Sequence, residues 1–162
     1  MPKFEHPIID EVAGLDLPYP EEIVINHGAA LVIRGLRPEH PDGDIDFSTN
    51  LENIRYLREQ LGWRAVSMNV GLKADGTMKT IIATRDPRER FDAHRWDFSM
   101  PRYRKTGKGR IYLPEQGALS EQDDRTGIWV AKLEYVRETK LETGRPQDEE
   151  DIELIDEYLQ AA

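Results

Sequence analysis

The stretch that decides the fold has four parts: Glu22–Asn26 (EIVIN), His27-Gly28, Ala29–Leu36 (AALVIRGL) and, after a loop, Asp44–Ser48 (DIDFS). The β-branched first part predicts a short buried strand. Apolar residues at near-helical spacing predict a short helix in the third part. Polar and apolar residues alternate in the last part, as in a strand with one buried face. This continuous segment therefore predicts a strand, a helix and a second strand, in that order.

The remainder of the chain continues with both patterns. Leucine and isoleucine at helical spacing predict a helix from Leu51 that ends at Gly62. The dipeptide Asp75-Gly76 between two β-rich segments is a strong hairpin signal. Proline favours the first turn of a helix, so a last helix is expected to start at Pro146. The other expected elements are strands over Arg64–Leu72, Thr77–Thr84, Arg88–Trp96 and Arg110–Leu113, a polar loop over Phe98–Gly109, and a helix over Gly127–Leu141.

These elements fit one α/β (α+β) domain over residues 1–162. Residues 1–20 hold four prolines and are expected to be an irregular lead-in with one short turn. Residues 21–113 are expected to form a small mixed sheet with flanking helices. Residues 114–162 are expected to form a C-terminal helical pair. With 38% hydrophobic residues, a chain of this length can bury an ordinary core.

Composition excludes several classes of protein. The sequence has no cysteine, which excludes a disulfide scaffold, a cysteine-ligated zinc or iron–sulfur site and thiol catalysis. No apolar run is long enough for a membrane span, and the first 20 residues lack the apolar segment of a signal peptide. We therefore expect a cytoplasmic protein with no membrane partner. A net charge of −9 also argues against a general nucleic-acid binder.

The net charge conceals a basic segment. Arg85–Arg110 contains nine basic and four acidic residues, a local charge of +5 in an otherwise acidic chain. One interpretation is a solvated loop that pairs with the acidic C-terminal helices. The other is a local site for an anionic partner, such as a strand of RNA. The sequence leaves both open.

Asp44 and Asp46 are the feature of the sequence that most clearly indicates a chemical function. Strand alternation puts both carboxylates on one face, about 6–7 Å apart, where they repel unless a cation lies between them. Mg²⁺ takes oxygen ligands of this kind together with substrate phosphates. Gly28 lies at an expected helix N-terminus, where backbone N–H groups attract anions. An EF-hand calcium loop starting at Asp42 is a poor fit, because Phe47 and Asn53 occupy its required glycine and glutamate positions.

In this order, the motifs resemble a known superfamily. Ile23–Arg37 followed by Gly43–Phe47 is similar to the nucleotidyltransferase fold, in particular to the abortive-infection toxin-like nucleotidyltransferases. That branch has a hydrophobic-Gly-Gly-x-Ala-Leu segment, a Gly-Leu-Arg segment and an Asp-Ile-Asp segment. Lys132-Leu133 and Gly144–Ile152 resemble its C-terminal Lys-Leu helix and Asp-x-x-Asp-Ile segment. The matched pieces bracket most of the chain.

The resemblance implies roles for individual residues. Asp44 and Asp46 would bind Mg²⁺ or Mn²⁺ and act in catalysis, and Gly28 with the N–H of Ala29 would hold the phosphates of a nucleoside triphosphate. Asp92 is expected to be the third catalytic carboxylate, with Asp97 as its competitor. The cationic side chains expected to neutralise phosphate charge are Arg34, Arg37 and Lys132. The chain departs from the family pattern at three positions: Ala29, Asp42 and Gln147.

The leading hypothesis is a metal-dependent nucleotidyltransferase that moves a nucleoside monophosphate to a hydroxyl on RNA or protein near Arg85–Arg110. The resemblance implies the toxin of a toxin–antitoxin pair, with an antitoxin protein as partner. An alternative is a catalytically inactive nucleotidyltransferase-like domain that binds a nucleotide or a protein. A third reading is a metal-dependent nuclease that uses the same carboxylates.

Overall fold

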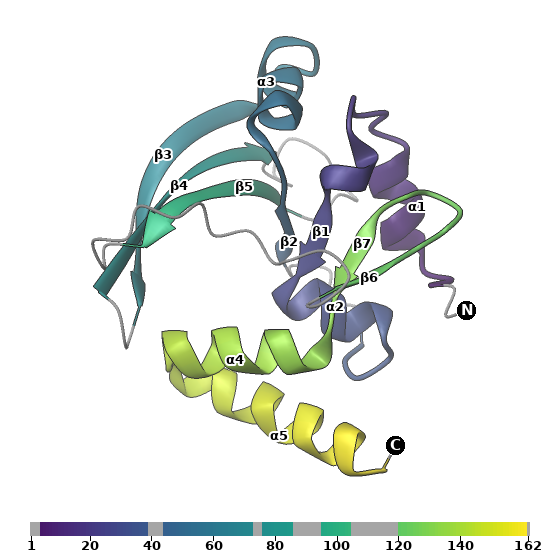
Figure 1. Ribbon diagram of the computed structural model, residues 1–162, viewed down its shortest axis with the longest axis vertical. Helices are drawn as coiled ribbons and strands as arrows, with labels where there is room; N and C mark the ends of the chain where they lie inside the picture. Colours follow the sequence, from purple (N-terminus) through teal and green to yellow (C-terminus); the bar gives the residue numbers. More distant parts are fainter. Residues whose placement is uncertain (1–3, 39–43, 73–75, 86–94, 105–119, 162) are drawn as a thin grey trace.

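The computed structural model describes residues 4–38, 44–72, 76–85, 95–104 and 120–161. It is an α+β structure whose strands form one mixed sheet in the order β3-β4-β5-β2-β1-β7-β6 (Figure 1). The described elements are α1 (Pro7–Ala13), a 3₁₀ turn (Pro20–Glu22), β1 (Val24–Asn26), α2 (His27–Ile33), β2 (Asp44–Ser48), α3 (Leu51–Glu59), β3 (Arg64–Leu72), β4 (Gly76–Arg85), β5 (Arg95–Arg104), β6 (Ser120–Gln122), β7 (Trp129–Ala131), α4 (Leu133–Thr143) and α5 (Pro146–Ala161).

The short strand β1 is central to the sheet. It pairs antiparallel with β2 on one side and parallel with β7 on the other. β2 in turn pairs parallel with β5, from which the β4–β3 hairpin continues outward. The expected mixed sheet is therefore confirmed, and it reaches from the hairpin to the strands that precede the last two helices.

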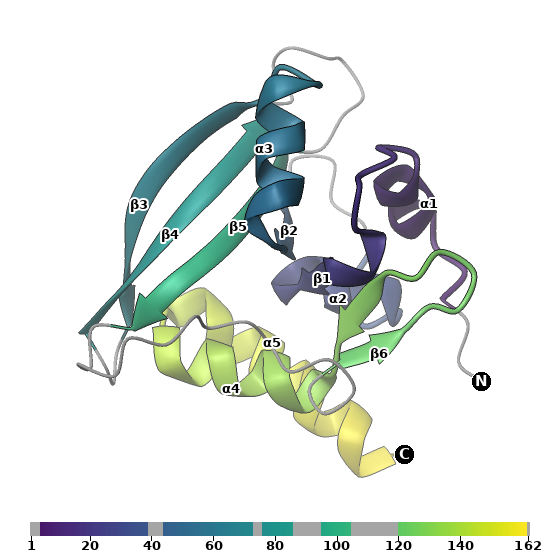
Figure 2. The ribbon, with the colours of Figure 1, turned by 45° about the horizontal axis from the view of Figure 1, so that its top comes forward.

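Helices cover the sheet in two places. α3 packs against β3, β4 and β5, and α2 packs against β1, β2 and β7. α4 and α5 lie against one another, with α4 next to α2, at the same end of the molecule as α2 (Figures 1 and 2). Side chains from sheet and helices fill the core, and those with essentially no exposure include Ile25, Leu31, Phe47, Leu57 and Val130. No helix in the described ranges is long and apolar enough to cross a membrane.

Local sequence signals predicted several of these elements well. The β3–β4 hairpin forms with Leu72 opposite Gly76. β2 occupies Asp44–Ser48 as expected. α3 starts after Asn50, whose side chain accepts a hydrogen bond from the backbone N–H of Asn53 at 2.9 Å. The expected C-terminal helical pair is present, separated by Gly144 at φ 60.

Two expectations were wrong. The expected loop Phe98–Gly109 is strand up to Arg104, and Pro101 sits where the β4–β5 register shifts, a position that tolerates proline. The expected helix Gly127–Leu141 begins only at Leu133, because the short apolar run Trp129–Ala131 is strand β7. The short turn expected at Ile8–Ala13 is present as the helix α1, whose first turn is capped by the His6 side chain. The expected strand Arg110–Leu113 and most of Arg88–Trp96 lie outside the described residues.

A buried ion network joins α4 to α5. The Lys140 amino group, 5% exposed, lies 2.8 Å from Asp151 and 3.4 Å from Asp148. Arg145 makes two hydrogen bonds to the Asp148 carboxylate, at 3.0 and 3.1 Å. Arg37, from the connection between α2 and β2, lies 3.3 Å from Asp151. The network therefore holds the helical pair together and also ties it to the segment that leads into β2.

Lys140→Met tests how far folding depends on this network. Removing the buried cation leaves two buried carboxylates with only the more exposed Arg145 and Arg37, so we expect a loss of about 3 kcal/mol in unfolding free energy. Arg137→Met is the matched control, because Arg137 also joins α4 to α5 through Asp156 but its side chain is 33% exposed. Urea unfolding should show a much smaller change for that variant. Equal losses in the two variants would contradict a special role for the buried network.

Candidate functional site

The candidate site lies where β1 ends and α2 begins. Because β2 runs antiparallel to β1, its first residues Asp44–Asp46 lie at the edge of the sheet where β1 finishes with Asn26. β7 runs parallel to β1, so Lys132 follows β7 at the edge where His27 follows β1. Three separate segments of the chain therefore converge here.

Strand register aligns carboxylate positions across the sheet. Asp46 is paired with Asn26 on β1 and with Asp97 on β5. Paired positions of a sheet lie on one face, and alternation adds position 44 to the same face. The expected third carboxylate, Asp92, lies outside the described residues. Its competitor Asp97 is the one that the register brings next to Asp46.

Charged groups of the helical pair surround His27. The pKa of His27 is lowered to about 4, mainly by burial and also by the nearby cations Lys140 and Arg145, while Asp148 opposes them. The imidazole is therefore neutral at pH 7. The backbone of His27 has φ 53, a left-handed conformation that favours glycine. The charge of Asp46 raises the pKa of Arg145, after the larger effect of the Asp148 hydrogen bond.

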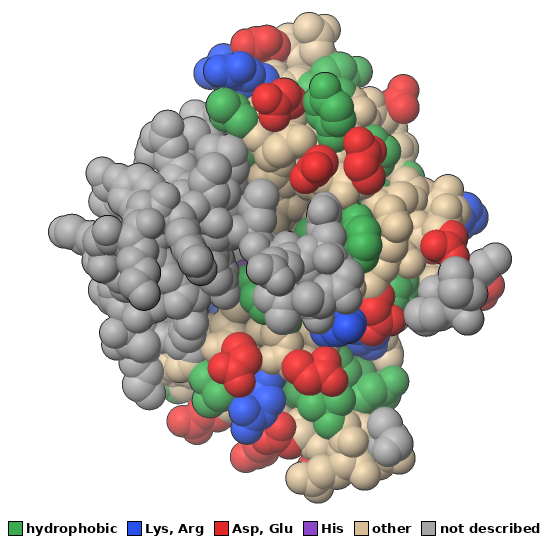
Figure 3. All heavy atoms as spheres, viewed as in Figure 1, with side chains coloured by type: hydrophobic (Ala, Val, Ile, Leu, Met, Phe, Trp, Pro, Cys, Tyr) green, Lys and Arg blue, Asp and Glu red, His purple; other side chains and the backbone are tan. Residues whose placement is uncertain are grey.

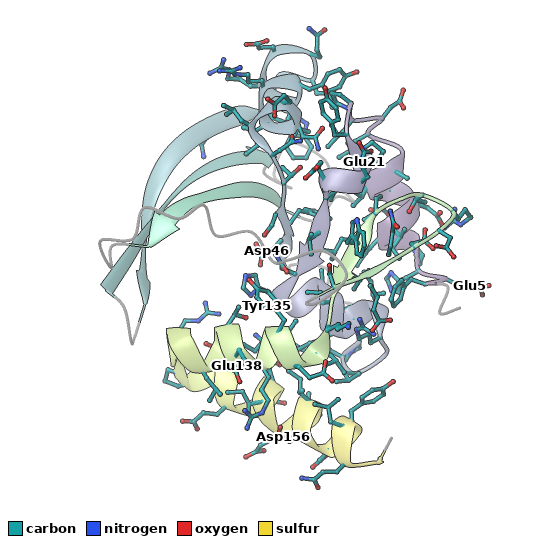
Figure 4. The ribbon with its side chains drawn as sticks, viewed as in Figure 1. Glu5, Glu21, Asp46, Tyr135, Glu138 and Asp156 are labelled. Carbon is teal, nitrogen blue, oxygen red and sulfur yellow. The ribbon has the colours of Figure 1, made fainter. Side chains whose placement is uncertain are left out.

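Arg37 and Gly28 lie together, as the predicted phosphate-binding group requires. A Cβ added to Gly28 would lie 3.8 Å from the Arg37 guanidinium. Ala29, the next residue of this group, is 3% exposed and packs in the core, so only its backbone could serve a ligand. Figure 4 shows the side chain of Tyr135, from α4, extending toward the end of the sheet that carries Asp46.

Arg34, in contrast, is held elsewhere. It follows the last residue of α2, and its guanidinium donates to the Ala131 carbonyl at 3.2 Å and reaches Glu121 at 3.4 Å. The same group lies 5.1 Å from the centre of the Phe4 ring. Arg34 thus joins α2 to β6, β7 and the N-terminal segment, and we do not assign it to the phosphates.

Sequence reasoning missed Lys140, Arg145 and Asn26. Lys140 and Lys132 both fell within one predicted helix, and only the three-dimensional packing distinguishes the buried lysine from the half-buried one. Asp148 and Asp151 are spaced i, i+3, which places both on one face of α5. This i, i+3 spacing is the sequence signal that could have indicated a buried cation packed against α5.

The donor set suits a hydrated divalent cation. Within the described side chains no group of three or more His, Cys, Asp or Glu residues is arranged to hold a metal ion. The side chain of Asp46 is described there, whereas those of Asp44 and Asp97 are not. The buried side-chain oxygen of Asn26, paired with Asp46, has no hydrogen-bond partner. Carboxylate and amide oxygens are ligands or acceptors of the kind that Mg²⁺ and its waters use.

Comparison of the chain with protein-family models, curated proteins and solved structures gives no match. The site is therefore argued from its own geometry. On the face shown in Figure 3, acidic side chains lie over α3 and over the helical pair, whereas Lys140 and Arg145 act on the pKa of His27.

His27→Gln tests the neutral state of this histidine. A pKa of about 4 in the folded protein against 6.5 when unfolded means that the unfolded chain binds the extra proton as pH falls. Unfolding free energy contributed by His27 is therefore fully present above pH 6.5 and decreases down to about pH 4, by at most about 3 kcal/mol. Glutamine does not titrate, so denaturant unfolding across this window should show a flatter pH dependence. Parallel pH profiles for the two proteins would show that His27 is not buried as described.

Proposed function

We propose that this protein is a metal-dependent nucleotidyltransferase that transfers a nucleoside monophosphate from a triphosphate to a hydroxyl group on RNA or protein. The observation that carries the proposal is the row Asn26, Asp46, Asp97 across three adjacent strands, next to the β1–α2 connection. With Asp44 on the same strand face, three carboxylate positions occur at one edge of the sheet. This is a suitable arrangement for binding divalent cations beside a phosphate chain.

Nearby cations support the proposed binding of a nucleoside triphosphate. Arg37 lies over Gly28, and Lys140 and Arg145 act on the pKa of His27 in the same region. Positively charged groups close to a transferring phosphoryl group stabilise the charge of its transition state. We therefore assign phosphate binding to Arg37 and the backbone at Gly28 and Ala29, with Lys132 at the same sheet edge.

The chain's own residues would divide the reaction between them. The acceptor hydroxyl forms a bond to the α-phosphorus, the bond to the bridging α–β oxygen breaks, and pyrophosphate leaves. Asp44 and Asp46 would hold Mg²⁺ or Mn²⁺, which when bound offsets the negative charge of the phosphates. Asp97 would take the acceptor proton or complete the metal site. Because His27 is neutral, it has no positive charge that would compete with the metal ion for the carboxylates.

The acceptor and the biological setting belong to the same proposal. The basic segment Arg85–Arg110 includes β5, and β5 carries Asp97. Because this segment of charge +5 contains one of the carboxylate positions, we propose that it holds an anionic acceptor such as RNA. A toxin restrained by an antitoxin protein remains our proposal for the setting, and it rests on the resemblance of the sequence alone.

The proposal predicts that Asp44→Asn with Asp46→Asn abolishes transfer. The protein is incubated with each labelled nucleoside triphosphate, Mg²⁺, and total RNA or protein. We expect labelled acceptor with the unmodified chain, and at least a 100-fold loss, roughly the scale of losing one group that stabilises transition-state charge, with the double variant. Asp156→Asn, which alters an ion pair on α5, is the control that should keep activity.

Two other outcomes would redirect the assignment. Cleavage of RNA or DNA without any triphosphate would indicate a nuclease. Binding of a nucleotide or a protein without transfer of any label would indicate a catalytically inactive domain. Either result would contradict the proposed reaction.

A second prediction separates the two candidates for the third carboxylate. Because the register pairs Asp97 with Asp46, Asp97→Asn should lower the transfer rate by about 100-fold or more, whereas Asp92→Asn should retain most activity. Initial rates at saturating triphosphate make the comparison. The reverse ranking would show that the third carboxylate is Asp92.

A further inference from the structure

Asn26 holds a buried oxygen that folding leaves without a partner. The residue is 4% exposed and lies at the end of β1. Its side-chain Nδ2 donates to the hydroxyl of Ser48, itself 5% exposed, on the neighbouring strand. Its Oδ1 has no hydrogen-bond partner. A buried acceptor in this state is unfavourable, so a ligand that donates to it would relieve the deficit.

The usual structural reason for an asparagine here does not apply. Asn26 occupies the N-cap position of α2, where a side-chain oxygen commonly accepts from the helix backbone, yet it makes no such hydrogen bond. The bond to Ser48 fixes one end of the amide instead and leaves the other end unsatisfied. In the strand register Asn26 is directly paired with Asp46. The free oxygen therefore belongs to the residue next to the proposed cation ligand.

We infer that Asn26 Oδ1 accepts a hydrogen bond from a water molecule bound to the divalent cation that Asp46 holds. The inference rests on the proposed function and adds a positioning residue to its metal site. A carboxamide oxygen is an acceptor, and the waters on a divalent cation are strong donors. Mg²⁺ keeps several of its waters in protein sites, so an acceptor beside a carboxylate can orient the hydrated ion.

Ser48 fixes the orientation of the Asn26 side-chain amide. Its hydroxyl accepts from Asn26 Nδ2, which fixes the amide so that Oδ1 is the atom left for the ligand. β2 thus supplies both the proposed cation ligand, Asp46, and the group that orients its neighbour. Loss of Ser48 should weaken cation binding less than loss of the Asn26 oxygen itself.

Titration with Mn²⁺ alone, followed by water-proton relaxation, tests this role without relying on activity. Asn26→Leu keeps the side chain's approximate size and removes the acceptor, so we expect the Mn²⁺ dissociation constant to rise about tenfold or more. Its urea midpoint should change little, because removal of the unsatisfied oxygen is offset by loss of the hydrogen bond to the buried Ser48 hydroxyl. Asn26→Asp keeps an acceptor and should bind Mn²⁺ at least as tightly as the unmodified chain. Ser48→Ala should show a smaller weakening than Asn26→Leu.

Asn53→Leu is the matched control. Asn53 is also fully buried, but its side chain bonds both backbone groups of Tyr19 and the Thr49 hydroxyl. That variant should lose stability and keep its Mn²⁺ affinity. Equal weakening by Asn53→Leu and Asn26→Leu would mean that the effect is general destabilisation, and would overturn the inference.

Asp46→Asn separates this inference from the proposed function. Loss of Mn²⁺ binding in Asp46→Asn, with unchanged binding in Asn26→Leu, would overturn the role of Asn26 and leave the metal site standing. Unchanged binding in Asp46→Asn would overturn the metal site itself. If Asn26→Leu does not fold, the comparison of Asn26→Asp with Ser48→Ala decides, and weaker binding by the aspartate variant would contradict the inference.

Discussion

Burial of the Lys140 side chain is the constraint on which the packing of α4 against α5 depends. An ammonium group that is 5% exposed must be paired, because an isolated charge in this position would be prohibitively unfavourable. Asp148 and Asp151 provide the pairing from one face of α5, which fixes the rotation of that helix against α4. Since Asp151 also pairs with Arg37, the same charges tie the residues after α2 to α5. The position of β2 itself is set by its pairing with β1 and β5.

Charged groups of both signs lie in the ion network and at the sheet edge. Lys140, Arg37 and Arg145 against Asp148 and Asp151 leave one positive charge. The positions at the sheet edge contribute three negative charges when all are ionised, from Asp44, Asp46 and Asp97. Arg95, which the strand register pairs with Asp44, and Lys132, which follows β7, add two positive charges, so the formal charges of all these groups cancel.

Local features of this fold could be predicted from the sequence, and long-range ones could not. Strand β2, the hairpin at Asp75-Gly76 and the stop at Gly144 depend on alternation and turn chemistry within a few residues. Strand β5 was missed because Pro101 suggests a loop, although it sits at a shift in strand pairing that removes the conflict. The third carboxylate depends on which strand pairs with β2, and no local pattern distinguishes Asp92 from Asp97. Lys140 and Lys132 differ in the same way, by burial against α5 rather than by spacing.

Two buried asparagines differ in how completely their side-chain amides are hydrogen-bonded. Asn53 uses its amide fully, joining α3 to the segment that precedes β1 through Tyr19 and Thr49. Asn26 is equally hidden from solvent, but only its nitrogen is used. An apolar residue in place of Asn26 would remove the unsatisfied oxygen but also the hydrogen bond to the buried Ser48 hydroxyl, so stability alone does not decide this position. The oxygen without a partner lies on the residue paired with Asp46, and it is there that we propose a donor from a ligand completes the hydrogen bonding.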